Sequence, residues 1–268
     1  MRAFQIWTPR KFSFRHKGEL FEGQVFGGSN DSLADAQSDA ERRWEAVCQR
    51  ITGAAPRRTA DYEADIREEI LRPAGASAVV TRNRYGAEVL NCPETVILDI
   101  DRPPKGFFDL FRKPASPEQI KERITQRLKT FVETRQLGIL GARIYHTPNG
   151  VRAILRTKVT DPRSNEMRTV MKALKVDRLY ALLCQRQGCY RARLTAKPIR
   201  LGLKSLGQQW PVADDAMAAR ADWVARYAMM CRSFAACRFV SQVGDAPSSP
   251  VVALHDELSG ALGTLPLA

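Results

Sequence analysis

Hydrophobic and polar residues alternate over residues 95–101, which read TVILDID. Neighbouring side chains in an extended strand point to opposite faces. The apolar residues therefore share one face, and Asp99 and Asp101 share the other. The pattern predicts a strand that packs on one side and carries two carboxylates on the other.

The segments after this strand predict a β-α-β-β-α-β order. In chain order they are the strand 95–101, a helix over 117–136, strands at 141–147 and 151–157, a helical stretch over 165–186 broken near residue 176, and a strand at 190–195. This is the split βαβ order of a ferredoxin-like or RRM-like antiparallel sheet, in which the first and third strands lie side by side in the centre. We therefore expect an α+β fold with Asp99 and Asp101 beside the start of strand 151–157.

Three further regions are expected around this core. Residues 1–75 predict an N-terminal packing module, in which a β-hairpin with a Lys17-Gly18 turn precedes a helix. The RRM-like core then occupies residues 76–213. Residues 214–243 predict a C-terminal helical element, and residues 244–268 have the composition of a linker and tail.

The net charge of the chain is +13, from 42 Lys plus Arg and 29 Asp plus Glu. Residues 1–134 hold 22 basic and 20 acidic residues, whereas the rest of the chain holds 20 and 9. Residues 178–204 contain no acidic residue among several basic ones. Such a segment suits a polyanion, either nucleic acid or a nucleotide triphosphate, although a solvated basic surface has the same composition.

The chain contains no run of 18 apolar residues, and its N-terminus lacks the apolar stretch of a signal peptide. We therefore expect a soluble cytoplasmic protein that does not enter a membrane. The six cysteines are scattered, and this favours free buried thiols over a disulfide scaffold or a zinc site.

The two aspartates predict a metal site. Two carboxylates held close together repel each other unless a cation lies between them, and Mg²⁺ or Mn²⁺ prefers carboxylate oxygens. Strand 151–157 and the residue after it add Arg152, Arg156 and Lys158, cations that can bind phosphate beside such a metal. A simple structural ion pair between Asp99 and Arg152 is the alternative interpretation.

The segments VILDID and ARIYHTPNGVRAILRT, with the helix between them, resemble the catalytic core of archaeo-eukaryotic-type primases. This family includes primase-polymerases and the polymerase domains attached to bacterial DNA-repair ligases. Its first motif is an apolar strand ending in Asp-x-Asp, and its second is a strand opening with Ser-Gly-x-x-Gly-x-His. The similarity spans about residues 95–200.

The resemblance implies metal-dependent extension of a nucleic-acid chain, with DNA expected, from nucleotide triphosphates. Asp99 and Asp101 match the catalytic and metal-binding acids, Arg152 stands where the family has its nucleotide-binding histidine, and Asp161 and Asp177 are the candidates for a third acid. The residues expected to bind nucleotide or phosphate are Asn149, Arg152, Arg156 and Lys158. Those expected to contact nucleic acid are Arg143, Arg191, Arg193, Lys197 and Arg200.

Two other functions stay open at this point. A non-catalytic nucleic-acid-binding protein would use the basic segment 178–204, with Phe107, Phe108 and Phe111 as further contacts. An accessory protein of a mobile-element or defence system would instead meet an acidic partner. A serine or cysteine hydrolase is disfavoured, because the chain has three histidines and none lies near a nucleophile-elbow sequence.

Overall fold

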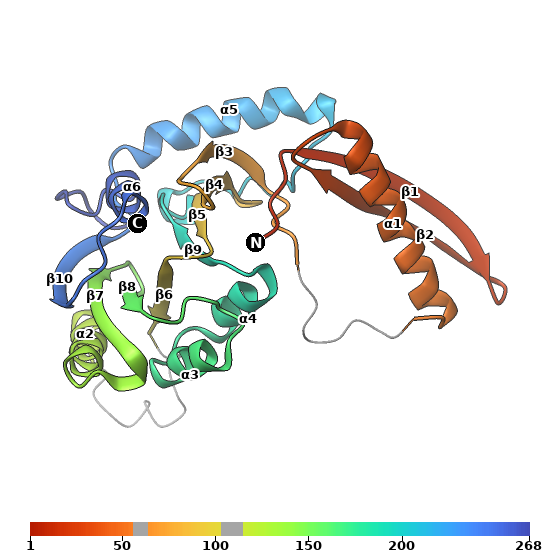
Figure 1. Cartoon of the computed structure of the whole chain (residues 1–268). Helices are drawn as coiled ribbons and strands as arrows, with labels where there is room; N and C mark the ends of the chain where they lie inside the picture. The colour runs from red at the N-terminus through yellow and green to blue at the C-terminus, as the bar shows by residue number, and fades with distance from the viewer. Residues whose placement is uncertain (56–63, 103–114) are drawn as a thin grey trace.

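The computed structural model of the chain describes residues 1–55, 64–102 and 115–268, and it has an α+β fold (Figure 1). Its helices are α1 (Leu33–Thr52), α2 (Pro117–Glu133), α3 (Asn165–Ala173), α4 (Arg178–Gln187), α5 (Asp214–Cys231) and α6 (Pro250–Leu258). Its strands are β1 (Ile6–His16), β2 (Glu19–Ser29), β3 (Glu69–Pro73), β4 (Val79–Arg82), β5 (Glu88–Cys92), β6 (Val96–Asp101), β7 (Ile139–His146), β8 (Gly150–Thr157), β9 (Tyr190–Arg193) and β10 (Arg238–Gly244). Short 3₁₀ turns lie at Gln136–Gly138 and Pro198–Leu201.

The N-terminal module is the predicted hairpin and helix, and it stands at one side of the molecule (Figure 1). Strands β1 and β2 pair as far as His16 and Glu19. Lys17 and Gly18 have φ values of 50° and 85°, and such left-handed values match a two-residue turn to the twist of its strands. The prediction of a turn at this dipeptide is confirmed.

Helix α1 lies directly on this hairpin. The Ser32 side chain caps its first turn by accepting a hydrogen bond from a backbone N–H. Trp44 stacks on Phe12, with ring centroids 4.2 Å apart. A Cβ atom at Gly27 of β2 would lie 2.0 Å from the Ala36 carbonyl oxygen, so glycine is needed for this close approach.

The core of the molecule surrounds an antiparallel sheet with the strand order β10-β7-β8-β6. Its largest fully buried side chains include Ile97, Leu98, Ile144 and Ile154. The amphipathic helix α2 packs on β7 and β8 and begins in a complete capping box at Ser116. The predicted neighbours β6 and β8 are paired, and the turn before β8 joins it to β7 as expected.

The strand order does not confirm the ferredoxin-like arrangement. In that arrangement the last strand of the motif would pair with β6, but β9 pairs with β5 in a second antiparallel sheet of order β3-β4-β5-β9. The edge strand β10, which the sequence analysis did not predict, joins β7 on the far side of the first sheet. Strand β9 still contacts β6, so the two sheets adjoin at the end of β6.

The second sheet is covered by α5, which crosses above β3 and β4 (Figure 1). Arg220 of α5 is 4% exposed and donates a 2.6 Å hydrogen bond to Glu69 of β3. Because β3 begins at Glu69, the boundary between module and core lies before the predicted one at residue 75.

The C-terminal boundaries also need correction. Residues 214–243 are not a purely helical element, since β10 follows α5. Residues 244–268 are not a linker and loose tail, since α6 begins at a Ser249 cap and buries Val252 and His255. None of the helices in the described residues combines the length and the apolar character needed to cross a bilayer.

Candidate active site

The two aspartates lie at the end of β6, on the same face of the strand, as the alternation predicts. Asp99 is opposite Arg152 in the register with β8, and Asp101 is opposite Gly150. A Cβ atom at Gly150 would lie 2.2 Å from the Ile100 carbonyl oxygen, so glycine allows the two strands to meet here. The turn before β8 is closed by a 3.0 Å hydrogen bond from the Gly150 N–H to the Thr147 hydroxyl.

Asp99 forms a two-point ion pair with Arg152. The Arg152 Nε and Nη2 atoms lie 2.8 and 3.2 Å from the two carboxylate oxygens. The Arg152 side chain is 3% exposed and that of Asp99 is 25% exposed. Burial alone would raise the pKa of Asp99, but the attached guanidinium outweighs it and the pKa is lowered. Asp99 is therefore ionised and held in place.

A buried polar chain continues behind Arg152. Its Nη1 donates to the Arg193 carbonyl oxygen at 2.9 Å and lies 3.2 Å from His255 Nε2. Because a guanidinium can only donate, Nε2 is the acceptor, and the proton of the neutral ring is on Nδ1, 2.9 Å from Asp256. Asp256 in turn accepts from Arg143 at 2.6 Å. Helix α6 thus fixes Arg152 from the side opposite Asp99.

Asp101 has no such partner. Its residue is exposed, and its carboxylate forms no hydrogen bond or ion pair with another residue that the structure describes. Partial burial raises the pKa of Asp101, and the nearby carboxylates of Asp99 and Asp177 raise it further. Asp101 is therefore the acid of this site that gains most from a bound cation.

A small polar hollow of about 60 Å³ opens beside the two aspartates. This is room for about four water molecules or one phosphate-sized group. Of the described residues, four basic and two acidic ones line it, and the turn residue Asn149 forms part of its wall. The basic residues are Arg152, Arg193, Lys197 and Arg200.

The cations of the hollow are crowded. Burial and the neighbouring positive charges lower the pKa values of Arg193 and Lys197, and burial lowers the pKa of Arg200. None of these three side chains forms an ion pair within the described part of the chain. An anion bound among them would relieve the repulsion between these positive charges.

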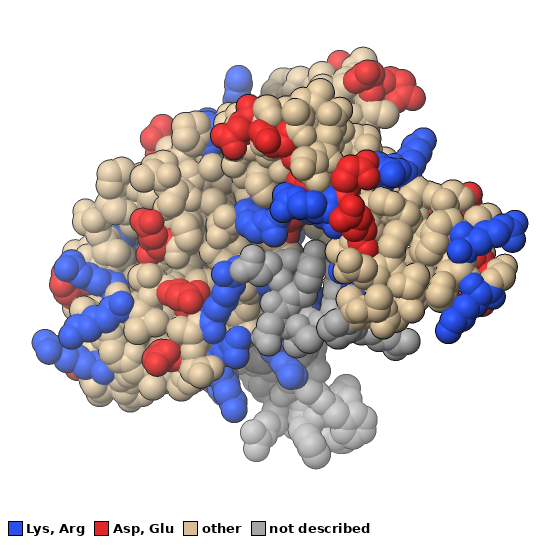
Figure 2. Space-filling view, turned by 45° about the vertical axis from the view of Figure 1, so that its right-hand side comes forward, with Lys and Arg blue, Asp and Glu red and all other residues tan. Residues whose placement is uncertain are grey.

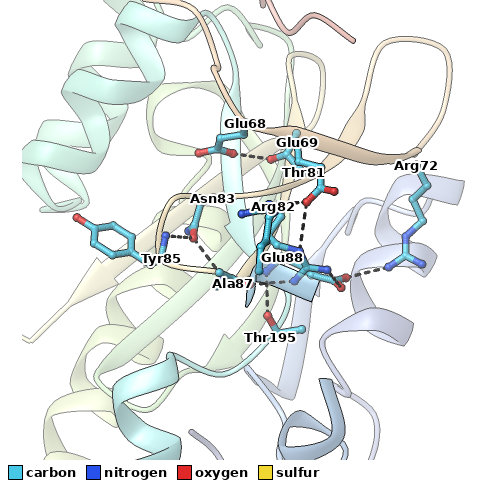
Figure 3. A network of polar contacts seen from close by, with 12 residues as sticks. Glu68, Glu69, Arg72, Thr81, Arg82, Asn83, Tyr85, Ala87, Glu88 and Thr195 are labelled. Carbon is cyan, nitrogen blue, oxygen red and sulfur yellow. Dashed lines mark hydrogen bonds and ion pairs between the residues drawn. The ribbon is translucent and has the colours of Figure 1, made fainter. Parts of the chain in front are cut away.

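The strand that carries Arg193 is held in place by a polar network (Figure 3). The Glu88 backbone N–H donates to the Thr195 hydroxyl at 3.0 Å, and the Glu88 carboxylate binds Arg72 and Arg82. The Thr195 hydroxyl is also 2.7 Å from the phenol of Tyr227 in α5. The second sheet therefore positions the cationic wall of the hollow.

Several predicted site residues lie elsewhere. Arg156 and Lys158 are exposed at the other end of β8, where Arg156 binds Asp245 at 3.0 Å, and four residues of strand place Arg156 about 13 Å from Arg152. Arg143 is bound by Asp256, and Arg191 is bound by Glu68 at 2.7 Å from both carboxylate oxygens. Phe107, Phe108 and Phe111 lie outside the described residues.

Of the two candidates for a third acid, Asp177 is near the pair. Its backbone N–H is 3.4 Å from the Asp99 carbonyl oxygen, and its charge acts on Asp101. Its side chain caps α4 by accepting from the Tyr180 N–H at 2.7 Å. Asp161 instead accepts from the Arg163 N–H within its own loop.

The ligands of the site suit a metal ion that is held jointly by the protein and by substrate phosphates better than one that is held by protein side chains alone. Within the described ranges no three His, Cys, Asp or Glu side chains gather in a way that would hold a metal ion. Mg²⁺, however, is commonly bound by one or two carboxylates together with substrate phosphates. Asp101, with Asp99 through its remaining lone pairs, fits that second pattern.

The sequence analysis missed His255 and Asp256, because residues 244–268 suggested a tail. A usable signal was present: Ser249 followed by Pro250 is a helix start, and an apolar stretch with one histidine follows it. The three comparisons with known proteins found nothing similar, since no protein-family model, curated protein or solved structure matches the chain.

Proposed function

We propose that this protein is a primase-like nucleotidyltransferase, which transfers nucleotides from nucleoside triphosphates to a nucleic-acid strand. One observation supports this best: two carboxylates at the end of a strand share a small hollow with four cations. Asp99 and Asp101 resemble the acids of the first primase motif, and the cations that line the hollow suit the phosphates of a nucleotide.

The roles follow from the partners of each side chain. Lys197, Arg200 and Arg193 share the hollow with Asp99 and Asp101 but form no ion pair within the described residues, so they are the groups that bind a triphosphate and offset its charge. Arg152 is held by Asp99 and His255, so it forms a fixed cationic floor. In the transfer, the oxygen of the strand hydroxyl bonds to the α-phosphorus, the bond from the α-phosphorus to the oxygen that bridges to the β-phosphorus breaks, pyrophosphate leaves, and the hydroxyl proton passes to water.

Mg²⁺ or Mn²⁺ is the metal that this chemistry requires. Asp101 would hold it together with the phosphates, with Asp99 as a second ligand. Such a cation supplies charge neutralisation between the phosphate oxygens and the carboxylates. The pKa of Asp101 is raised because burial and the carboxylates of Asp99 and Asp177 outweigh the cations Lys197 and Arg193, and a bound metal would add the remaining positive charge.

An extension assay tests this proposal. The intact chain is given primed and unprimed DNA templates, nucleoside triphosphates and Mn²⁺, and it is compared with the variants Asp101→Ala and Asp31→Asn. Asp31 is an exposed acid of the N-terminal module and serves as the control. We expect product from the parent and from Asp31→Asn, and a loss of at least a hundredfold with Asp101→Ala. Equal product from all three proteins would refute the proposal.

A non-catalytic nucleic-acid-binding protein is the second candidate. The closed pair of Asp99 with Arg152 favours it, since of the two acidic side chains that line the hollow in the described residues, that pair leaves Asp101 without an ion pair. Sites that use two metal ions need more ligands than this. Template binding without product under any of the metal conditions would support this candidate.

A further inference from the structure

An open groove of about 1240 Å³ runs beside the hollow, whose volume is about 60 Å³, and Asp101 lines both. Residues of α2, α3 and α4 form its walls, and those of α4 reach from Arg178 to Gln185. This volume exceeds that of most small-molecule pockets, so the groove suits a chain molecule. The reaction proposed above gives this groove no role.

The rims of the groove are positively charged. Among the residues that the structure describes, seven Lys and Arg side chains line it, against the two acids Asp101 and Asp177. Five of the seven are exposed and form no ion pair with any residue in the described ranges: Arg102, Arg123, Lys172, Lys175 and Arg178. The α2 rim and the α3–α4 rim each contribute to this set, so positive charge lies along both sides.

Apolar side chains line the groove together with the cations. Ile120 and Met171 are among them, and Leu179 and Leu182 of α4 add residues that are 64% and 38% exposed. No aromatic side chain of the described residues lines the groove. A duplex keeps the faces of its bases stacked inside, whereas a single strand offers both phosphates and exposed base faces. Cations and exposed apolar side chains in one groove therefore suit a single strand.

We propose that the groove between α2, α3 and α4 binds a single strand of nucleic acid and leads its end to Asp101. This rests on the proposed function, because the groove would deliver the strand on which the hollow acts. The contacts are phosphate to cation and base to aliphatic side chain, so binding depends strongly on salt and little on sequence.

The charge-reversed variant Arg123→Glu with Arg178→Glu tests the groove from both rims. Both substitutions suit their helices: position 123 is an exposed site in α2, and position 178 is the first residue of α4, where a negative charge is favourable. Lys11→Glu with Arg15→Glu, on exposed positions of β1, makes the same change of charge away from the groove. Circular dichroism confirms that both variants are folded.

Fluorescence anisotropy of a labelled, mixed-sequence 20-nucleotide DNA measures the binding. We expect the dissociation constant to rise at least tenfold in the groove variant and less than twofold in the control. The slope of log K against log salt should fall by about 1.4, at about 0.7 for each of two lost phosphate contacts. Equal affinities of the two variants would overturn the proposal, as would displacement of the strand by polyglutamate as readily as by unlabelled DNA.

The variant Asp101→Asn separates this inference from the proposed function. It should bind the strand at least as tightly as the parent, because it removes a negative charge and no cation from the lining of the groove. Groove-dependent binding without any extension by the parent would refute the proposed reaction and support the groove. If the parent extends the strand and the double variant Arg123→Glu with Arg178→Glu binds it as the parent does, the proposed reaction is supported and the groove is refuted.

Discussion

Asp99 and Asp101 lie two residues apart on one strand face, yet their surroundings give them opposite properties. Asp99 is ionised in a two-point pair, and its pKa is lowered. Asp101 has no protein partner among the described residues, and its pKa is raised. A carboxylate kept in an unfavourable place is typical of a binding site, since stability is lost there for the sake of a ligand.

Asp101→Asn should therefore stabilise the protein at pH 7. A folded-state pKa above the ordinary value of 3.8 means that the folded chain binds the proton more tightly, so stability falls as pH rises from about 3.8 through the raised pKa. Removing the charge abolishes this loss. Thermal unfolding should show a higher Tm for the variant at pH 7 and a smaller difference at pH 4. A lower Tm at pH 7 would show that Asp101 has a stabilising partner.

Asp99→Asn should have the opposite effect and cost about 3–5 kcal/mol of unfolding free energy, because it leaves a buried guanidinium without its counter-ion. Urea denaturation measures the loss. The matched control is Asp245→Asn, which breaks the exposed pair with Arg156 and should cost at most about 1 kcal/mol. Similar losses for both variants would mean that the Asp99 pair is no more important than a surface pair.

His255 should make the protein sensitive to mild acid. Burial and Arg152 lower its pKa below 6.5 despite Asp256, so the unfolded chain binds the proton more readily. Stability is therefore lost as pH falls below about 6.5. The variant His255→Gln has no imidazole to protonate. The difference in unfolding free energy between the parent and this variant should therefore become smaller from pH 7 to pH 5. Parallel pH profiles of unfolding free energy for the two proteins would contradict this.

At the scale of elements, local patterns predicted local structure well. The hairpin turn, the capped helix α2 and the alternation of β6 each depend on neighbours in sequence, and each was found. The pairing of β9 was not predictable, because four alternating residues fit the edge of β6 and the edge of β5 equally well. The position of α6 was not predictable either, because a helical period does not say which sheet face the helix covers.

Gly150→Ala tests how closely β6 and β8 must meet. The added Cβ would lie 2.2 Å from a backbone oxygen of β6, so the strands must separate beside Asp101. We expect a loss of about 1–3 kcal/mol in urea denaturation, together with weaker triphosphate binding. Gly263→Ala is the control, since its Cβ would meet nothing closer than 3.6 Å. An unchanged stability for Gly150→Ala would show that the strand pair tolerates the separation.

At the scale of the whole molecule, the site combines segments that are far apart in sequence. Asp99, Arg152, Lys197 and His255 come from four elements or loops, and the two sheets adjoin where they meet. The excess of basic residues in the second half of the chain was visible in the sequence, but the partners of these basic side chains were not. Arg143, Arg191 and Arg220 serve as internal ion-pair partners.

The remaining cations are distributed unevenly over the surface. On the face shown in Figure 2, acidic groups stand near the top, and basic side chains lie among scattered acidic ones over the middle and lower parts. The net charge of +13 favours the approach of a polyanion. The sequence could predict a polyanionic partner, and the structure was needed to distinguish the cations that have protein partners from those of the hollow and the groove.

The most direct test of the candidate active site is a calorimetric titration with a non-hydrolysable nucleoside triphosphate in the presence and absence of Mn²⁺, because it depends on no choice of template. We expect the parent to bind the triphosphate more tightly with Mn²⁺, Asp101→Asn to lose that metal-dependent gain, and Lys197→Gln to bind at least tenfold more weakly. If all three proteins bind the triphosphate with the same affinity with and without Mn²⁺, the hollow is not its binding site.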